Sequence, residues 1–197
     1  MADLRGHAHL ARLIPFTMWG CFFHKRFMEN EPNEKSPIRP TNDEARQLGK
    51  QLMRDARFAA LATFEPDSEF PVVSRIAFAL DDNGLPVSLI STLALHTKAL
   101  LKNPLCSLLV GEPKKGDPLA HPRITLQARA QQIDKSGEEY VALRAHYLEI
   151  HPKSKLYVDF GDFFFFRFAV QSAYLNGGFG KAFILKPEDL RGAYAGN

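Results

Sequence analysis

The residues between Pro71 and Lys98 offer the chemical groups that bind a phosphate. Ser74 and Arg75 lie on a predicted strand, and a polar cluster follows the next one. A phosphomonoester dianion is held by a bidentate guanidinium, by hydroxyl donors and by backbone N–H groups at a helix start, where the dipole is positive. The cluster consists of Ser91, Thr92, His96, Thr97 and Lys98. We therefore expect a phosphate site here. The alternative is that the hydroxyls cap the helix and the lysine faces solvent.

Two strands and a turn must position this cluster. Residues 58–64 (FAALATF) form an apolar run without polar alternation, which predicts a buried strand. Residues 71–81 and 85–91 flank Asp82-Asn83-Gly84, where Asn and Gly tolerate a positive φ. We expect these two segments to pair as a hairpin, with Arg75 on the strand beside the one that ends at the cluster.

The remaining pattern predicts a mainly β fold. Thr41 with Glu44, and Ser136 with Glu139, have the spacing of capping boxes and predict two helix starts. Apolar and polar residues alternate in 123–133, as in a sheet with one buried face. Phe163–Phe166 is predicted to place two rings on each sheet face. Further strands are expected at 105–111, 163–170, 172–176 and 182–185, and a further helix from about residue 93 or 96 to 102. About six strands with two or three helices indicate an antiparallel barrel that carries helices.

The composition argues for one globular domain without nucleic acid as a partner. The chain of 197 residues has 25 Lys and Arg against 22 Asp and Glu. The whole excess lies in residues 1–27, and from Met28 onward the two signs are equal in number. A broad basic surface is therefore not expected. The only cysteines, Cys21 and Cys106, lie far apart, which favours a reducing compartment, and we expect a cytoplasmic protein.

The first residues are expected to lie outside the folded domain. Leu10–Phe23 is apolar but is interrupted by Arg12 and is too short for a membrane span. We expect residues 1–40 to be an extension, with Met28 as the natural start or else a disordered or interfacial arm before it. Residues 41–190 should form the domain and 191–197 a tail.

Common catalytic and metal-binding motifs are absent. The sequence has no GxGxxG turn, Walker loop, paired-cysteine zinc site, HExxH helix or GxSxG elbow. No metal site is predicted. The phosphate cluster is therefore the candidate site.

Four segments, in order, resemble one known family. They are FAALATFEPDSEFPVVSRIAFALDDNGLP, ISTLALHTKALLKNPLCSLLVGE, KKGDPLAHPRITLQARA and YLNGGFGKA. Together they are similar to the pyridoxamine 5'-phosphate oxidase-like FMN-binding split barrels, in particular to the subgroup with the haem-utilisation (HugZ-type) proteins. The resemblance covers roughly residues 43–183.

The resemblance implies a six-stranded split barrel, a homodimer, and an FMN in each of two clefts formed by both subunits. It assigns the FMN-binding positions to Ser74, Arg75, Ser91, His96, Thr97, Lys98 and Gln127. It implies a flavin-dependent oxidoreductase acting on a small molecule, and in such enzymes the cofactor carries the chemistry. An asparagine would be usual in the family at Ala99, and a lysine or arginine near His96.

The resemblance also leaves alternatives. A true pyridoxamine phosphate oxidase is not expected, because the Trp-bearing C-terminal stretch with an Arg-x-His motif is missing. Haem binding or haem breakdown is the second reading, with an iron-binding histidine among His96, His121, His146 and His151. A non-catalytic flavin carrier is the third reading.

Overall fold

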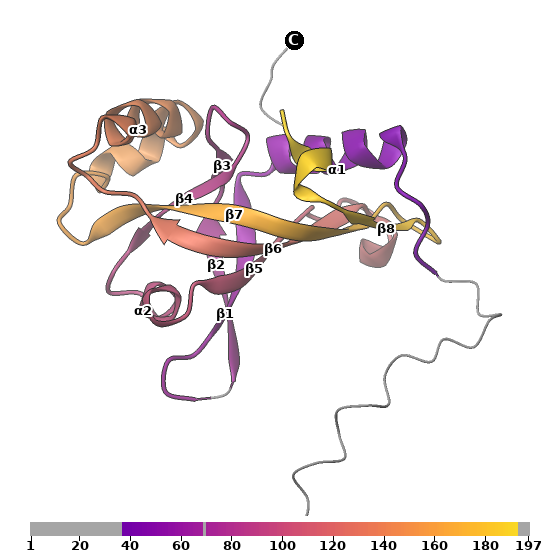
Figure 1. Cartoon of the computed structure of the whole chain (residues 1–197), viewed down its shortest axis with the longest axis horizontal. Coiled ribbons are helices and arrows are strands. Elements are labelled where there is room, and N and C mark those ends of the chain that lie inside the picture. The colour runs from indigo at the N-terminus through magenta and orange to yellow at the C-terminus, as the bar shows by residue number, and fades with distance from the viewer. Residues whose placement is uncertain (1–36, 69, 193–197) are drawn as a thin grey trace, which may run out of the picture. The chain divides into compact units, whose positions relative to one another are not determined.

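The computed structural model describes residues 37–68 and 70–192. These residues form one curled antiparallel sheet with helices packed around it (Figure 1). The predicted fold class, a mainly β antiparallel barrel with helices, is therefore confirmed, with eight strands in the described residues where six were predicted. The expectations for residues 1–36, including a start at Met28, and for 193–197 lie outside the described residues.

Eight strands and three α-helices occur in the described part of the chain. The strands are β1 (Phe58–Phe64), β2 (Pro71–Ala77), β3 (Ala79–Leu80), β4 (Pro86–Ser91), β5 (Leu105–Val110), β6 (Arg123–Gln132), β7 (Phe163–Asn176) and β8 (Ala182–Leu185). The helices are α1 (Asp43–Asp55), α2 (Leu95–Lys102) and α3 (Glu138–Ile150), with short 3-10 turns η1 (Pro118–Ala120), η2 (Pro152–Leu156) and η3 (Pro187–Leu190). The segments expected at 163–170 and 172–176 form one strand, β7, with a register irregularity opposite Gln127 and Ala128.

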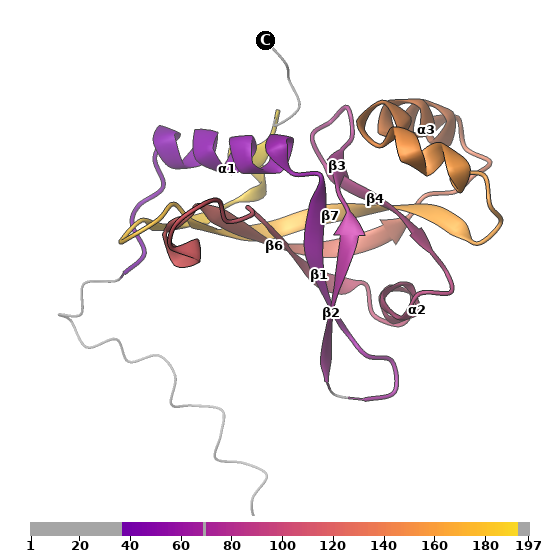
Figure 2. The same ribbon diagram turned by 180° about the vertical axis from the view of Figure 1, so that it is seen from behind.

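The sheet has the strand order β2-β1-β5-β6-β7-β4-β3, and β8 pairs with β7. All of these strand pairs are antiparallel. The sheet curls so far that β2 and β4, which are not hydrogen-bonded neighbours, also come into contact. Helix α2 packs against β1 and β2 beside this opening, as the view from behind shows (Figure 2). The arrangement is that of a barrel with one side split.

The predicted hairpin is confirmed only next to its turn, where Ala79 and Leu80 of β3 pair with Val87 and Pro86 of β4. β2 pairs along its whole length with β1, where Arg75 lies opposite Ala60. β4 pairs instead with β7 and with the two-residue strand β3. The chain turns away from β1 at Phe78, whose N–H donates to the Arg57 carbonyl at 2.9 Å and whose ring is fully buried. Arg75 is therefore not on the strand that pairs with β4.

The turn at the centre of that prediction is nevertheless present. The Asp81 carboxylate accepts hydrogen bonds from the N–H groups of Asn83 and Leu85, both at 2.9 Å. Gly84 has a φ of +77°, which a residue with a side chain rarely adopts. The short sequence signal thus identifies the turn, although it does not identify which strands pair.

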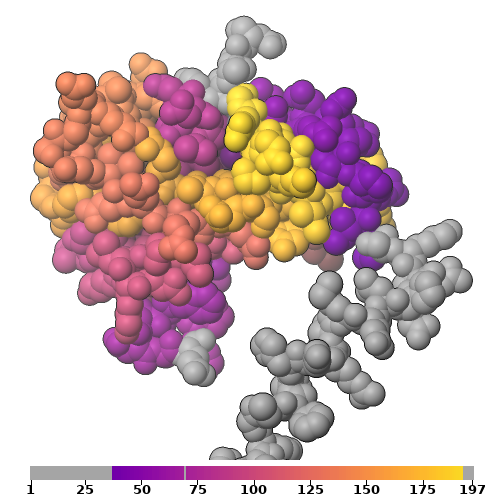
Figure 3. All heavy atoms as spheres, in the orientation of Figure 1, coloured from indigo at the N-terminus to yellow at the C-terminus, as the bar shows by residue number. Residues whose placement is uncertain are grey.

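Two apolar clusters hold the sheet from opposite sides. One fills the curl of the barrel and includes Met53 of α1, Leu108, Leu126 and Phe166. The other lies between the sheet and α3 and includes Tyr147 and Phe165. Phe164 packs with the first cluster and Phe163 with the second, so the prediction of two rings on each face is confirmed. The space-filling view shows the α3 segment at one end of the sheet and α1 with η3 at the other (Figure 3).

Both helix caps lie one residue later than predicted. The Asn42 side chain accepts from the Ala45 N–H at 2.9 Å and caps α1. Thr41 instead donates its hydroxyl to the Ile184 carbonyl of β8 at 2.8 Å. Gly137 is the N-cap of α3, because the Ser136 side chain binds Asp134. A hydroxyl that finds a partner outside its helix is not available as a cap.

Candidate ligand-binding face and the start of α2

The face of the sheet that points away from the barrel interior is largely uncovered in the described chain. Strand pairing places two rows of side chains across it, because alternate residues of a strand share a face. We call these two rows the outer face. The first row is Arg75, Ala60, Leu109, Thr125, Tyr174 and Ile184, and the second is Val73, Ala62, Ser107, Gln127 and Ser172.

The two rows of the outer face are apolar or neutral apart from one cation, Arg75. Val73 on the edge strand β2 is 67% exposed, and Leu109 on the inner strand β5 is 42% exposed, which is high for an aliphatic side chain in the middle of a sheet. None of the eight strands contains Asp or Glu, and their charged residues are all arginines: Arg75, Arg123, Arg129 and Arg167. A hollow of about 230 Å³ lies at the β8 end of this face, lined among others by Arg123, Tyr174 and Ile184. Such a face suits a flat apolar molecule that carries negative charge.

Arg75 is the charged residue of the outer face. Its guanidinium carbon lies 4.8 Å from the centre of the Phe58 ring, so the ring orients the side chain while leaving its N–H groups for a ligand. Arg75 makes no ion pair with any described residue. Ser74 is next to it on the strand and so points to the opposite face, where it lies opposite the buried Leu61. The two predicted neighbours therefore do not face one site together.

Ser91 and Asp162 join the start of α2 to the start of β7. The Ser91 hydroxyl donates to the Asp162 carboxylate at 2.6 Å and accepts from the Leu93 N–H at 3.1 Å. The Thr92 N–H donates to the Asp162 carbonyl at 2.7 Å. Ser91 is predicted at the phosphate site, but the sequence does not link it to Asp162, because the two residues are 71 positions apart.

The other residues predicted at α2 are close together in the helix. His96 is half-buried and burial lowers its pKa, so its imidazole is mainly neutral at neutral pH. Its Nε2 atom and the Thr97 hydroxyl are buried without a hydrogen-bond partner. Lys98 is exposed, and the N-terminus of α2 has no side-chain cap. The structure thus brings together Ser91, His96, Thr97 and Lys98, while the Arg75 guanidinium packs on Phe58.

Gln127 lies in the middle of the outer face. Its side-chain oxygen accepts from the Ser172 hydroxyl at 2.7 Å. Gln127 is exposed, so its amide nitrogen is available to a molecule that covers the sheet. The predicted site residues are therefore divided between the outer face, with Arg75 and Gln127, and the start of α2.

None of the four described histidines belongs to the two rows of the outer face. The Nε2 atoms of His146 and His151 lie 2.8 and 2.9 Å from the carbonyls of Leu80 and Phe78. His121 lies 3.1 Å from the Lys115 carbonyl in the loop before β6. Within residues 37–68 and 70–192, no three His, Cys, Asp or Glu side chains are placed to hold a metal ion. No helix in the same residues is long and apolar enough to cross a membrane.

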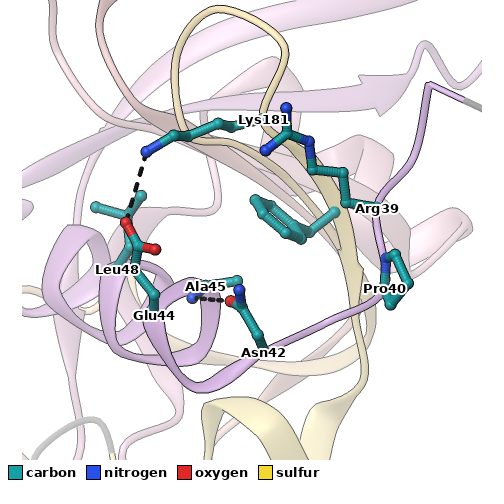
Figure 4. A pocket seen from close by; sticks show the side chains of 8 residues that line it. Arg39, Pro40, Asn42, Glu44, Ala45, Leu48 and Lys181 are labelled. Atoms are coloured by element: carbon teal, nitrogen blue, oxygen red, sulfur yellow. Dashed lines mark hydrogen bonds and ion pairs between the residues drawn. The ribbon is translucent and has the colours of Figure 1, made fainter.

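A second hollow lies at the start of α1 and shares Phe183 with the hollow at the β8 end of the outer face. It measures about 280 Å³, and the Arg39 and Lys181 side chains both lie along the upper edge of it in the view, across from Asn42 (Figure 4). Glu44 pairs with Lys181 at 3.5 Å, which offsets part of the positive charge. Leu48, Ala45 and Phe183 supply its apolar lining.

The curled sheet, the split between β2 and β4 and the helix placed beside it define a split β-barrel. Comparison with known families agrees: residues 40–190 match the family described as CREG, beta-barrel. The chain belongs to this family. The resemblance stated from the sequence, to split barrels that include haem-utilisation proteins, is confirmed.

The chain is similar to several proteins in other organisms. Over 126 residues the chain is 40% identical to the non-canonical heme oxygenase HOZ, chloroplastic, of Arabidopsis thaliana, covering 63% of this chain and 37% of that protein. A heme binding protein from Mycobacterium smegmatis is 28% identical with a TM-score of 0.68, covering 78% of this chain and 61% of that one. A protein of unknown function from Agrobacterium tumefaciens is 30% identical with a TM-score of 0.67, covering 78% and 64%. The chain thus spans less than two thirds of each of these three relatives.

Proposed function

We propose that this protein binds haem on the outer face, between two copies of the chain, and takes part in the oxidative breakdown of haem. The observation that carries the proposal is a sheet face without acidic residues, with exposed aliphatic side chains and an unpaired Arg75. The relatives described as a heme oxygenase and as a heme binding protein support the choice of ligand.

The chemistry of haem fits these residues. Its macrocycle is flat and apolar, and its two propionates are anionic. Exposed Val73 and Leu109 offer apolar contact, and burying them under the ring removes apolar surface from water. Arg75 offers a fork of N–H donors that matches a carboxylate, and its stacking on Phe58 limits the entropy lost on binding. In this proposal the side chains of the outer face bind and orient the group.

A second copy of the chain completes the site in this proposal. One sheet face covers only one side of a flat ligand, and the exposed aliphatic residues are typical of a surface that another protein covers. The predicted homodimer therefore remains part of the proposal. The four described histidines are absent from the outer face, so the proposal assigns the iron no ligand among them. When bound, haem supplies the oxygen chemistry, while these residues hold it and exclude water.

Flavin binding is the second candidate, and one observation favours it. The Thr97 hydroxyl and His96 Nε2 are buried without partners beside an uncapped helix start, which is where a phosphate would bind. The function would then be that of an FMN-dependent oxidoreductase or, without turnover, a flavin carrier. Against it, the Ser91 proton is already donated to Asp162.

Absorbance titrations of the purified protein with haemin and with FMN separate the two candidates. We expect a saturable Soret band with haemin, and then, with a reductant in air, loss of that band and appearance of a bilin product. Arg75→Ala should weaken haem binding about 10- to 100-fold, since hydrogen bonds to charged groups contribute about 1.5–3 kcal/mol. Arg54→Ala, which removes an arginine of α1, is the matched control and should bind normally. Saturable FMN binding without a haemin Soret band would contradict the proposal.

A further inference from the structure

An internal carboxylate stands beside the start of α2. Asp162 approaches from the beginning of β7 and accepts the Ser91 hydroxyl proton at 2.6 Å. Its own backbone carbonyl accepts from the Thr92 N–H at 2.7 Å. Both contacts involve the residues between the end of β4 and the first turn of α2. The loop that would have to receive a phosphate is therefore fixed to an acidic residue.

Because of its two hydrogen bonds, the Ser91 hydroxyl cannot donate a hydrogen bond to a phosphate. A hydroxyl has one proton, and the Ser91 proton is donated to Asp162. One acceptor site of the same oxygen is used by the Leu93 N–H at 3.1 Å. A phosphate oxygen that approached Ser91 would meet only lone pairs. It would also meet the negative charge of Asp162, and like charges at such distances repel strongly in a partly buried site.

The neighbouring residues do not offset this charge. Burial lowers the pKa of His96, so the imidazole adds no full positive charge at neutral pH. Thr97 is completely buried, and α2 has no acidic or basic residue in its first turn other than His96 and Lys98. Lys98 is exposed to solvent. Asp162 therefore places an anion beside Ser91 and Thr92, the residues that lead into the positive end of the helix dipole.

We propose that Asp162 determines ligand specificity by disfavouring phosphate esters at the start of α2. The inference deepens the proposed function, because it names what makes this chain select haem over FMN. Asp162 acts partly through Ser91, whose hydroxyl it orients, and partly through its own charge. The Asp162→Asn substitution removes the charge and keeps an oxygen that can accept the Ser91 proton.

The test compares FMN with riboflavin, which has the same ring system and no phosphate. Dissociation constants for both ligands are measured by flavin fluorescence at low ionic strength, where charge effects are largest. We expect Asp162→Asn to lower the ratio of the FMN constant to the riboflavin constant at least tenfold relative to the wild type. The riboflavin constant itself should stay the same. A merely structural role of Asp162 would change both ligands equally.

Two further variants keep the test decisive. Asp162→Ser also removes the charge and should show the same change if the Asn variant folds poorly. Asp159→Asn removes a carboxylate on the same turn that pairs with Arg144, and its ratio should equal that of the wild type. An unchanged ratio in both Asp162 variants, or no detectable binding of either flavin in any of the proteins, would overturn the inference. Haemin titration of the same proteins tests the proposed haem binding separately. If haem does not bind, the ratio of the FMN and riboflavin dissociation constants still tests the role of Asp162.

Discussion

The Arg167 guanidinium donates to the Asp81 carboxylate at 2.7 Å and so ties the middle of β7 to the turn after β3. The side chains are only 17% and 4% exposed. Asp81 also fixes the turn through the N–H groups of Asn83 and Leu85, while Arg167 pairs on its other side with Glu139 of α3. One buried ion pair thus connects a turn, a strand and a helix.

Breaking this pair should be costly. We expect Arg167→Ala to lower the free energy of unfolding by about 3–5 kcal/mol, because the Asp81 charge would remain buried without its partner. The control is Arg144→Ala, which removes an exposed pair with Asp159 and should cost about 0–1 kcal/mol. Urea unfolding of the three proteins measures the difference. An equal decrease in the free energy of unfolding in both variants would show that the buried Arg167–Asp81 pair contributes no more to stability than the exposed Arg144–Asp159 pair.

Acid should destabilise the protein through His96. Burial lowers the pKa of His96 in the folded state below its ordinary value of 6.5. The unfolded chain then binds more protons, so stability rises with pH through this region and falls as the pH drops below 6.5. His96→Gln should flatten the slope of unfolding free energy against pH between about pH 7.5 and 5.5, the range in which histidine titrates. A slope in His96→Gln equal to that of the wild type would refute the expectation.

The Thr97 hydroxyl should be a cost to the ligand-free protein. It is buried without a hydrogen-bond partner, so it loses its hydrogen bonds to water and gains none within the protein. Thr97→Val keeps the shape and should raise the free energy of unfolding by about 1 kcal/mol. Ser154→Ala is the opposite case, because the Ser154 hydroxyl is buried at 2.9 Å from the Tyr157 hydroxyl, and this variant should be less stable than the wild type. Thermal unfolding of the two variants and the wild type measures these changes. A less stable Thr97→Val protein would mean that the Thr97 hydroxyl does have a hydrogen-bond partner.

The glycine at the end of β5 is required by space as well as by conformation. Gly111 has a φ of +108°, and an added Cβ would lie 2.6 Å from the Pro122 carbonyl oxygen. Gly116 has a φ of +102° with nothing near its missing Cβ. Gly116→Ala should therefore cost only the backbone strain, on the order of 1–3 kcal/mol. Gly111→Ala should cost clearly more, and a loss equal to that of Gly116→Ala would show that the loop before β6 moves away freely.

The sequence predicts the strands and helices of this fold better than it predicts which strands pair and which residues cap the helices. Residues 58–64 and 123–132 are identifiable as strands because their apolar patterns are local. That β2 pairs with β1 depends on the Phe78 turn and its bond to Arg57, which no spacing rule encodes. The cap of α1 is displaced to Asn42 because Thr41 donates to Ile184, which is 143 residues away.

The candidate site shows the same limit. The residue types near α2 predict a phosphate-binding cluster, and the structure places two buried polar atoms without partners there, on His96 and Thr97. The outer face could not be recognised from one strand, because its two rows combine residues from as many as six strands. Asp162 could not be linked to Ser91 either, since only the pairing of β4 with β7 brings them together.

The most direct test of the proposed site is a haemin titration of a variant in which the outer face carries an acid. Leu109→Glu places a carboxylate in the row beside Ala60 and Arg75, where it would repel propionates and resist burial under the ring. We expect at least about tenfold weaker haem binding than in the wild type, a change of about 1.4 kcal/mol. Leu156→Glu makes the same change on η2, at a side chain that is 78% exposed, and should bind haem normally. Wild-type haem affinity in Leu109→Glu would contradict the placement of haem on this face.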